Sequence, residues 1–181
     1  YYQKPDYSAA EEHFRSFIRL ADDRQQNDLK TDAYIRLGDC FFMERSYDNA
    51  INYYDMATRI GKRNTDYALY QQGLCYGAKG NANQKITMLN DMLRSYPSTP
   101  YYEQALFEIG NTYLVHGDKR SAISNFNRLI KERPRSSYTR QAMMKVGMIY
   151  YNNNENDKAL EKLKEEDFYR DDNRMIYSAM L

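Results

Sequence analysis

The sequence predicts an all-α fold in which antiparallel helix pairs stack side by side as an α-solenoid. Two observations predict it. Four glycines recur in one frame at steps of 35, 37 and 37 residues, a period typical of helical repeats; they are Gly38, Gly73, Gly110 and Gly147. Around each glycine, apolar residues recur at spacings of three and four, as they do on one face of an amphipathic helix. Such a chain presents an extended binding surface rather than a catalytic cleft.

The glycine defines position 8 of a repeat, and two helices, A and B, fit each repeat around it. Small residues at positions 3, 8 and 20 let helix backbones approach closely, and large residues at positions 11 and 24 fill the space beside them. Glycine inside a helix costs about 1 kcal/mol relative to alanine, so its recurrence indicates that close packing outweighs this loss. Position 3 holds Ala33, Ala68, Ala105 and Ala142, and position 24 holds Tyr54, Leu89, Phe126 and Leu163.

The elements follow this frame in order. Residues 1–21 are predicted to form helix B of a partial repeat, because Ala10 and Phe14 fall at positions 20 and 24. A longer polar loop at 22–30 and four repeats are predicted next, the repeats at 31–62, 66–97, 101–134 and 138–170. Residues 173–181 are predicted to begin a further helix A or a terminal cap. Residues 1–181 are therefore expected to form a single array, cut in frame from a longer one.

Capping residues mark where the helices begin. Position 16, at the start of helix B, mostly carries side chains whose oxygens accept the free N–H groups of a first turn; its occupants are Asp6, Ser46, Asn81, Asp118 and Glu155. Gly80 and Gly117 precede two of them and mark the turn between helices. The segment Ser98-Thr99-Pro100 marks the start of the next helix A, since proline suits a first helical position.

Composition and motifs argue against several classes of function. The 181 residues carry 26 basic and 25 acidic side chains, so no strong attraction to nucleic acid or to an anionic membrane is expected. No run approaches the roughly 18 apolar residues of a membrane span. His13 and His116 lack neighbours at metal-ligand spacing, and no phosphate-binding loop or hydrolase motif occurs. We therefore expect no enzyme activity, no metal site and no cofactor.

The two cysteines fall at the same place in consecutive repeats. Equivalent residues on neighbouring helices of a solenoid lie roughly 8–10 Å apart, which exceeds the Cα separation that a disulfide tolerates. Cys40 and Cys75 are therefore predicted to be buried core residues with free thiols.

The repeat pattern resembles the tetratricopeptide repeat (TPR) family. One repeat matches the family pattern closely, through Ile109, Gly110, Tyr113, Gly117, Ala122, Phe126 and Pro134. Gln72, Lys85 and Glu166 depart from it, at positions where the family prefers apolar or small residues. The resemblance implies a right-handed superhelix in which helix A lines a concave face, with positions 2, 5, 9 and 12 pointing into it.

The resemblance also implies where a partner binds. Central anchors are expected at position 5, namely Tyr70, Phe107 and Met144. Positions 9 and 12 add Leu74, Asn111, Met148, Phe42, Leu114 and Tyr151. A mostly apolar, Met- and aromatic-rich lining suits an extended peptide or a helix of a protein partner. The same residues could instead pack within the array, and this alternative stays open.

The residues present argue against one subtype of the family and resemble another. TPR co-chaperones that hold a chaperone's C-terminal carboxylate use a clamp of Lys and Asn at positions 2, 5, 6 and 9, and the first repeat has Asp32, Ile35, Arg36 and Asp39 there instead. The linkers Tyr96-Pro97-Ser98-Thr99-Pro100-Tyr101 and Arg133-Pro134-Arg135-Ser136-Ser137-Tyr138 resemble those of bacterial cell-envelope TPR proteins, of the Tol–Pal-associated or outer-membrane assembly type. That resemblance implies the periplasm or cell envelope as the location, with the cytoplasm as the alternative.

The function expected from these observations is a non-enzymatic scaffold that binds a protein or peptide partner in its concave groove. A regulatory or targeting module of a larger enzyme or signalling protein is the second hypothesis. Self-association through the exposed ends of the array is the third, because open solenoid ends present apolar helix faces.

Overall fold

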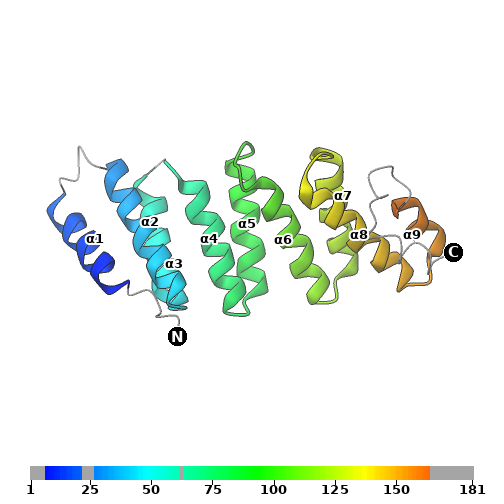
Figure 1. The fold of residues 1–181 in the computed structure, drawn as a ribbon, viewed down its shortest axis with the longest axis horizontal. Coiled ribbons are helices and arrows are strands. Elements are labelled where there is room, and N and C mark those ends of the chain that lie inside the picture. The colour runs from blue at the N-terminus through cyan, green and yellow to red at the C-terminus, as the bar shows by residue number, and fades with distance from the viewer. Residues whose placement is uncertain (1–6, 22–26, 62, 164–181) are drawn as a thin grey trace, which may run out of the picture. The chain divides into compact units, whose positions relative to one another are not determined.

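The computed structural model describes residues 7–21, 27–61 and 63–163, and all the regular structure in them is α-helical (Figure 1). The chain packs as two compact units, Tyr1–Tyr101 and Tyr102–Leu181. The boundary between them falls where the third complete repeat begins. The all-α fold of helix pairs predicted from the sequence is confirmed.

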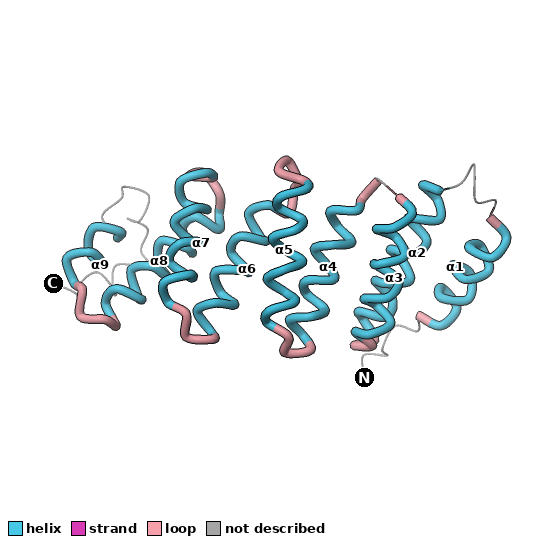
Figure 2. The backbone as a smooth tube through the Cα atoms, turned by 180° about the vertical axis from the view of Figure 1, so that it is seen from behind, coloured by secondary structure: helices cyan, strands magenta, loops and turns pink. Residues whose placement is uncertain are grey.

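The described part of unit 1 contains five helices, each packed against the next along the chain. They are α1 (Ser8–Leu20), α2 (Asn27–Met43), α3 (Tyr47–Ile60), α4 (Thr65–Ala78) and α5 (Ala82–Ser95). The described turns and loops are drawn in pink in Figure 2. Helix α1 is the predicted helix B of the partial repeat, and α2 begins four residues before the predicted repeat boundary at residue 31.

Unit 2 repeats the arrangement with α6 (Tyr102–Val115), α7 (Lys119–Glu132), α8 (Ser137–Tyr151) and α9 (Asn156–Leu163). Each of these helices packs against the next, and α6 also contacts α8. The predicted further helix at 173–181 lies outside the described residues.

Helix A ends in the same way in each of the four repeats described. The residue at position 15 adopts the left-handed conformation, which only glycine enters without steric cost; these residues are Arg45, Gly80, Gly117 and Asn154, with φ of 62°, 76°, 81° and 60°. The amide of position 16 then donates to the carbonyl of position 11, at 2.8 Å for Ser46 and 3.0 Å for Asp118. This Schellman motif satisfies the carbonyls at the helix end and turns the chain into helix B.

Side-chain caps begin two of the B helices. Asn81 accepts a hydrogen bond from the amide of Gln84 at 3.1 Å, and Asp118 accepts one from Ser121 at 3.0 Å. Ser46 precedes α3 and makes no side-chain cap bond to a backbone amide. Its hydroxyl instead accepts a hydrogen bond from the side-chain amide of Asn49 at 3.0 Å. Asp6 lies outside the described residues.

The spacing between the position-8 glycine and position 24 recurs from repeat to repeat for a direct physical reason. A Cβ atom on Gly38 would lie 2.5 Å from the Tyr54 ring, and one on Gly110 would lie 2.5 Å from the Phe126 ring. Both rings are fully buried. Helices A and B of a repeat therefore approach as closely as a backbone without a side chain allows, as the sequence predicts.

The departures from the family pattern in the second repeat are accommodated locally. Gln72 is buried, and its amide donates a hydrogen bond to the Ile51 carbonyl at 3.2 Å, so its polar group is satisfied. Lys85 replaces the usual small residue, and its alkyl chain runs beside Gly77, where a Cβ would lie 2.8 Å from the Lys85 Cδ. Glycine at position 12 thus makes room for lysine at position 20.

Cys40 and Cys75 are buried free thiols, as predicted. Burial raises the pKa of both, and the pKa of Cys75 rises to about 12. A thiol with a raised pKa holds little thiolate near neutral pH, which makes it a poor nucleophile.

Candidate partner-binding surfaces

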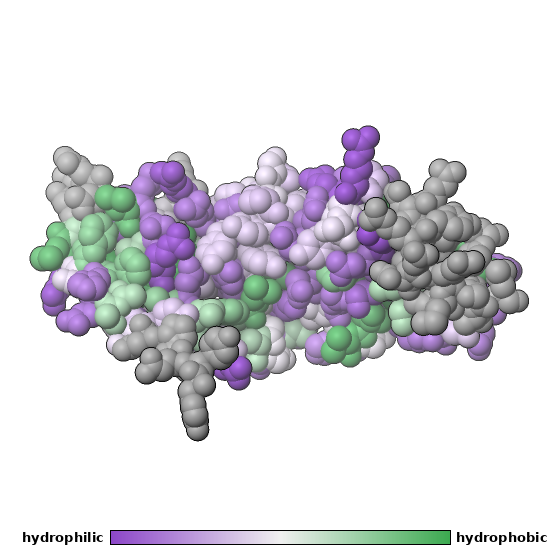
Figure 3. Space-filling view, in the orientation of Figure 1, coloured by the Kyte–Doolittle hydropathy of each residue, from purple (hydrophilic) through white to green (hydrophobic). Residues whose placement is uncertain are grey.

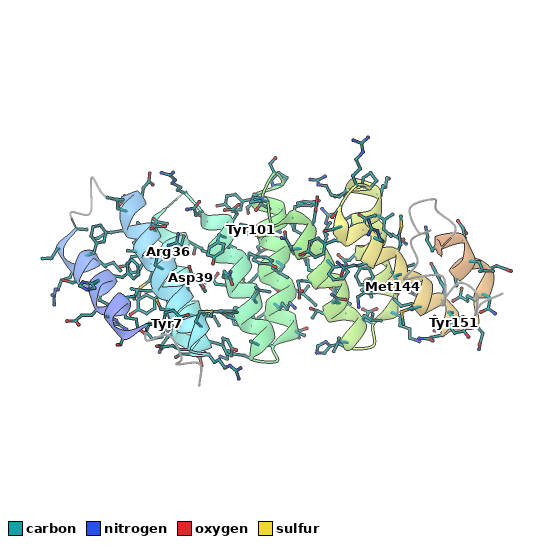
Figure 4. The ribbon with its side chains drawn as sticks, viewed as in Figure 1. Tyr7, Arg36, Asp39, Tyr101, Met144 and Tyr151 are labelled. Carbon is teal, nitrogen blue, oxygen red and sulfur yellow. The ribbon has the colours of Figure 1, made fainter. Side chains whose placement is uncertain are left out.

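The helix-A residues of unit 2 combine buried and exposed side chains. Met148 and Tyr151 of α8 are 45% and 41% exposed, whereas Met144 is half-buried against the core. Asn111 and Leu114 of α6 are half-buried. Figure 4 labels Met144 and Tyr151 at the two ends of this stretch of α8. Exposed methionine and tyrosine side chains are adaptable contacts for a protein partner.

Phe107 differs from the other anchors expected on helix A. It is 7% exposed, and its ring lies 5.7 Å from that of Phe126 and 5.4 Å from that of Tyr138. The Lys145 ammonium lies 5.8 Å from the centre of the ring. Phe107 therefore packs within unit 2, the alternative that the sequence left open, and we leave it out of the contact surface proposed below.

The helix-A residues of unit 1 are also partly covered. Phe42 is half-buried and packs edge-on against Tyr47 of α3, with ring centres 5.8 Å apart. Tyr70 is stacked on Tyr101 at 5.2 Å, and Leu74 is half-buried. Each of these side chains is therefore only partly exposed.

Two linkers close onto the preceding helix A through the same pair of contacts. Thr99 donates a hydrogen bond from its hydroxyl to Asp66 at 2.7 Å, and Ser136 donates one to Glu103 at 2.6 Å, each across 33 residues. Two residues after each hydroxyl, a tyrosine ring covers position 5 of the earlier helix, with Tyr101 on Tyr70 and Tyr138 on Phe107. We call this pair of contacts the linker closure.

The linker closure places a tyrosine ring over position 5 at Tyr70 and Phe107, whereas Ile35, at position 5 of the first repeat, is 2% exposed without such a ring. The sequence analysis singled out both linkers as a family resemblance but did not predict that their tyrosines cover helix A. The sequence contained a signal for these contacts. Each tyrosine follows its position-5 partner by 31 residues, and each hydroxyl residue follows the acidic residue at position 1 by 33.

A partly buried polar cluster links three helices of unit 1, α2, α3 and α4. The Asp39 carboxylate accepts hydrogen bonds from the Tyr54 hydroxyl at 2.8 Å and the Tyr67 hydroxyl at 2.9 Å. Its other oxygen lies 3.4 Å from the Arg36 guanidinium. Burial, and then the charge of Asp39, raise the pKa of Tyr54 and that of Tyr67 above the ordinary tyrosine value of 10.0. Asp39, expected from its position to face a partner, is therefore an acceptor shared by helices α3 and α4.

This cluster predicts a loss of stability at alkaline pH. In the unfolded chain Tyr54 and Tyr67 release their protons near pH 10, whereas the folded chain retains them, so the unfolded state binds fewer protons above that pH. We expect the free energy of unfolding to fall as pH rises above 10, by up to about 1.4 kcal/mol per pH unit for each group. Urea unfolding between pH 9 and 11 measures the slope.

The matched variant for this measurement is Tyr54→Phe, because it removes one titrating hydroxyl and keeps the ring. Its slope should be shallower than that of the wild type by about one proton. Equal slopes would contradict a retained proton on Tyr54. The raised pKa of Cys75 contributes in the same direction in both proteins, so the difference isolates the tyrosine.

A cleft of about 380 Å³ opens beside this cluster in unit 1. Its lining residues come from α2, from the start of α4 and from the linker before α6: Asp32, Ile35, Arg36, Asn64, Asp66, Tyr67, Pro100 and Tyr101. Arg36, Asp39 and Tyr101 are labelled in Figure 4. The sequence analysis named three of these residues only as evidence against a carboxylate clamp, and did not predict the cleft.

At the N-terminal end, α1 presents a different surface. Phe14 and Ile18 pack against the core of unit 1, whereas Phe17 and Leu20 are exposed. Figure 3 shows the resulting apolar surface over α1. This is the kind of solenoid end that the self-association hypothesis requires.

The described residues hold no group of three or more His, Cys, Asp or Glu side chains placed to bind a metal ion. None of the helices in that part of the chain is long and apolar enough to cross a membrane.

Comparison with known proteins agrees with this architecture. A family model described as a tetratricopeptide repeat-like domain matches residues 51–170, and a tetratricopeptide repeat model matches residues 1–65. No curated protein sequence matches the chain.

Similar solved structures share the fold at low sequence identity. The crystal structure of BtubC (BKLC) from P. vanneervenii is 16% identical, with a TM-score of 0.73, and the match covers 97% of this chain and 74% of that one. YrrB, described as a TPR protein with an unusual peptide-binding site, is 19% identical with a TM-score of 0.65, over 96% and 83% of the two chains. The TPR2AB domain of yeast Sti1 in its pHSP90 complex is 19% identical with a TM-score of 0.54, and the match covers 73% of this chain and 61% of that one. The repeat frame, the helix pairs and the family models together show that this chain belongs to the tetratricopeptide repeat family.

Proposed function

We propose that the chain is a non-enzymatic scaffold that binds a peptide or helix of a protein partner through the helix-A faces of its repeats. The observation that carries the proposal is the accessibility of Met148 and Tyr151 beside the half-buried Met144 on α8. Two neighbours support a role in protein interaction, YrrB with its peptide-binding site and the Sti1 domain in its pHSP90 complex.

The finer proposal is that this scaffold works in a bacterial cell-envelope complex. It is supported by the two proline-containing linkers that resemble those of envelope TPR proteins. The absence of a carboxylate clamp supports a partner other than a chaperone C-terminus, because Asp32 and Asp39 would repel a carboxylate.

The test is crosslinking of the protein in its native cells, with Met148→Asp compared to Met56→Asp. The two methionines are 45% and 43% exposed, and Met56 lies on helix B of the first repeat, so the variants differ in the face they alter rather than in the chemical change. We expect Met148→Asp to lose the crosslinked partner by about tenfold or more, because it places a charge in an apolar contact. Met56→Asp should retain the partner.

Two results would contradict the proposal. Retention of the partner by both variants would move the binding surface away from α8. Recovery of the wild-type protein with the cytosolic rather than the periplasmic fraction would overturn the envelope proposal and leave the scaffold proposal standing.

A further inference from the structure

The first junction of unit 1 lacks the linker closure. The segment Gly61-Lys62-Arg63-Asn64-Thr65 contains neither proline nor tyrosine. The Thr65 hydroxyl donates to the Gly61 carbonyl at 3.0 Å, within its own linker, instead of reaching back to helix A. Position 1 of the first repeat is Thr31, where the second and third repeats have Asp66 and Glu103 to receive such a hydroxyl. The cleft of about 380 Å³ lies at this junction.

The walls of the cleft are aromatic on one side. The rings of Tyr67 and Tyr101 lie 5.6 Å apart and tilted by 53°, and both residues line the cleft. Tyr67 is held by its hydrogen bond to Asp39, and Tyr101 by its stacking on Tyr70. Two tyrosine rings fixed in this way can contact a cation placed near their faces.

The remaining walls carry excess negative charge. Asp32 and Asp66 line the cleft, and Asp39 lies behind Tyr67. The one cation among the lining residues is Arg36, which is shared between Asp32 at 3.7 Å and Asp39 at 3.4 Å. The two carboxylates paired with Arg36 and the Asp66 carboxylate, which accepts the Thr99 hydroxyl, therefore outnumber the one guanidinium. The raised pKa of Tyr101, caused by burial and then by Asp66 and Asp39, agrees with a negative local potential.

We propose that this cleft binds the side chain of a lysine or arginine in an extended segment of the partner, which rests on the scaffold function proposed above. The cationic group lies between the tyrosine rings and the carboxylates of Asp32 and Asp66, where cation–π attraction and charge-assisted hydrogen bonds act together. The aliphatic part of the side chain packs on the rings. The cleft therefore prefers a positive charge, whereas a carboxylate clamp prefers a negative one. It selects a basic side chain within a sequence rather than the C-terminus of a chain.

Titration of the whole chain with defined peptides tests this proposal. Three pools of 12-residue peptides share random Gly, Ala, Ser and Val flanks and carry arginine, lysine or citrulline at the centre. Citrulline has the shape of arginine without its charge. We expect the arginine and lysine pools to shift the ring signals of ¹³C-labelled Tyr67 and Tyr101, and the citrulline pool to leave them unmoved at the same concentration. The affinity should fall as salt is added.

The matched variants are Asp32→Asn/Asp66→Asn and Asp55→Asn/Asp91→Asn. Both pairs raise the net charge by two, but Asp55 and Asp91 lie on α3 and α5 in ion pairs with Arg59 and Arg94. Asparagine at residue 66 keeps an oxygen to accept the Thr99 hydroxyl. The cleft pair should weaken binding of the basic pools by about tenfold, and the control pair by less than about twofold.

The outcomes separate this proposal from the scaffold proposal. Equal shifts with citrulline, or equal weakening by both variant pairs, would overturn the cleft proposal. The cleft proposal would also be overturned if Asp32→Asn/Asp66→Asn kept the crosslinked partner while Met148→Asp lost it. In that case the scaffold proposal would stand. Selective binding of the basic pools without any crosslinked partner in cells would support the cleft chemistry and contradict the scaffold.

Discussion

Replacing Phe107 by aspartate should unfold unit 2 rather than abolish binding on an intact surface. The ring is 7% exposed and packs on Phe126 and Tyr138, so the substitution removes a core side chain and leaves a carboxylate among aromatic rings. Loss of a buried phenylalanine costs about 3–5 kcal/mol, and the buried charge adds to it. That is a large part of the stability of a small domain.

Hydrogen exchange measured by mass spectrometry checks this expectation, because it reports on each helix separately. Protection should be lost along α6, α7 and α8. The control is Met148→Asp, which places the same charge on an exposed position of α8 and should change protection little. If Phe107→Asp kept its protection and its helicity, the ring would not be part of the core, and the sequence-based expectation of an accessible anchor would regain its support.

Replacing Gly110 by alanine should also destabilise unit 2, although alanine is the better helix former. The new Cβ would lie 2.5 Å from one Phe126 ring carbon and under 3 Å from two more, and this ring is fully buried. Relieving the overlap requires the two helices to move apart, which costs about 1–3 kcal/mol. That exceeds the gain in helix propensity of about 1 kcal/mol. Urea unfolding of the whole chain measures the difference.

Gly77→Ala is the matched control, because it makes the same chemical change within a helix. Its Cβ would meet the Lys85 alkyl chain at 2.8 Å, a flexible side chain that can rotate away. We expect Gly77→Ala to be neutral or slightly stabilising. In the double variant Gly110→Ala/Phe126→Leu, the leucine should recover part of the loss that Gly110→Ala causes. If the two alanine variants lowered the free energy of unfolding equally, the close approach at Gly110 would not be the cause of the loss.

The sequence predicts the fold well because the repeat frame is a local signal. Position-8 glycines, small residues at positions 3 and 20 and the caps at position 16 each act within one helix pair. The burial of Ala68, Ala105 and Ala122 and the contact of Gly110 with Phe126 follow from that frame. Each of these contacts joins residues no more than one helix pair apart, where spacing alone determines which side chains meet.

The candidate surface was predicted less well because it depends on contacts between repeats. Which face of helix A points inward follows from its period, but Tyr101 and Tyr138 reach position 5 of the preceding repeat from linkers without a regular period. The role of Asp39 was hidden for the same reason, since its two tyrosine donors come from helices 15 and 28 residues away. The lining of the cleft comes from α2, from the start of α4 and from the linker before α6, and the pattern of a single repeat does not reveal such a combination.

Because of the linker closure, the surface over position 5 can change without a change in the helical framework, although surface and framework are usually coupled in a folded domain. The helices carry the backbone framework, while a few residues between helices B and A supply the tyrosine ring that lies over Tyr70 or Phe107. Grafting Gly61–Thr65 in place of a closed linker would remove the covering tyrosine from that junction while leaving the rest of the helix pairs unchanged. An array of this type is therefore modular in its linkers, so that new recognition patterns can arise by exchanging short segments while the helical framework stays constant.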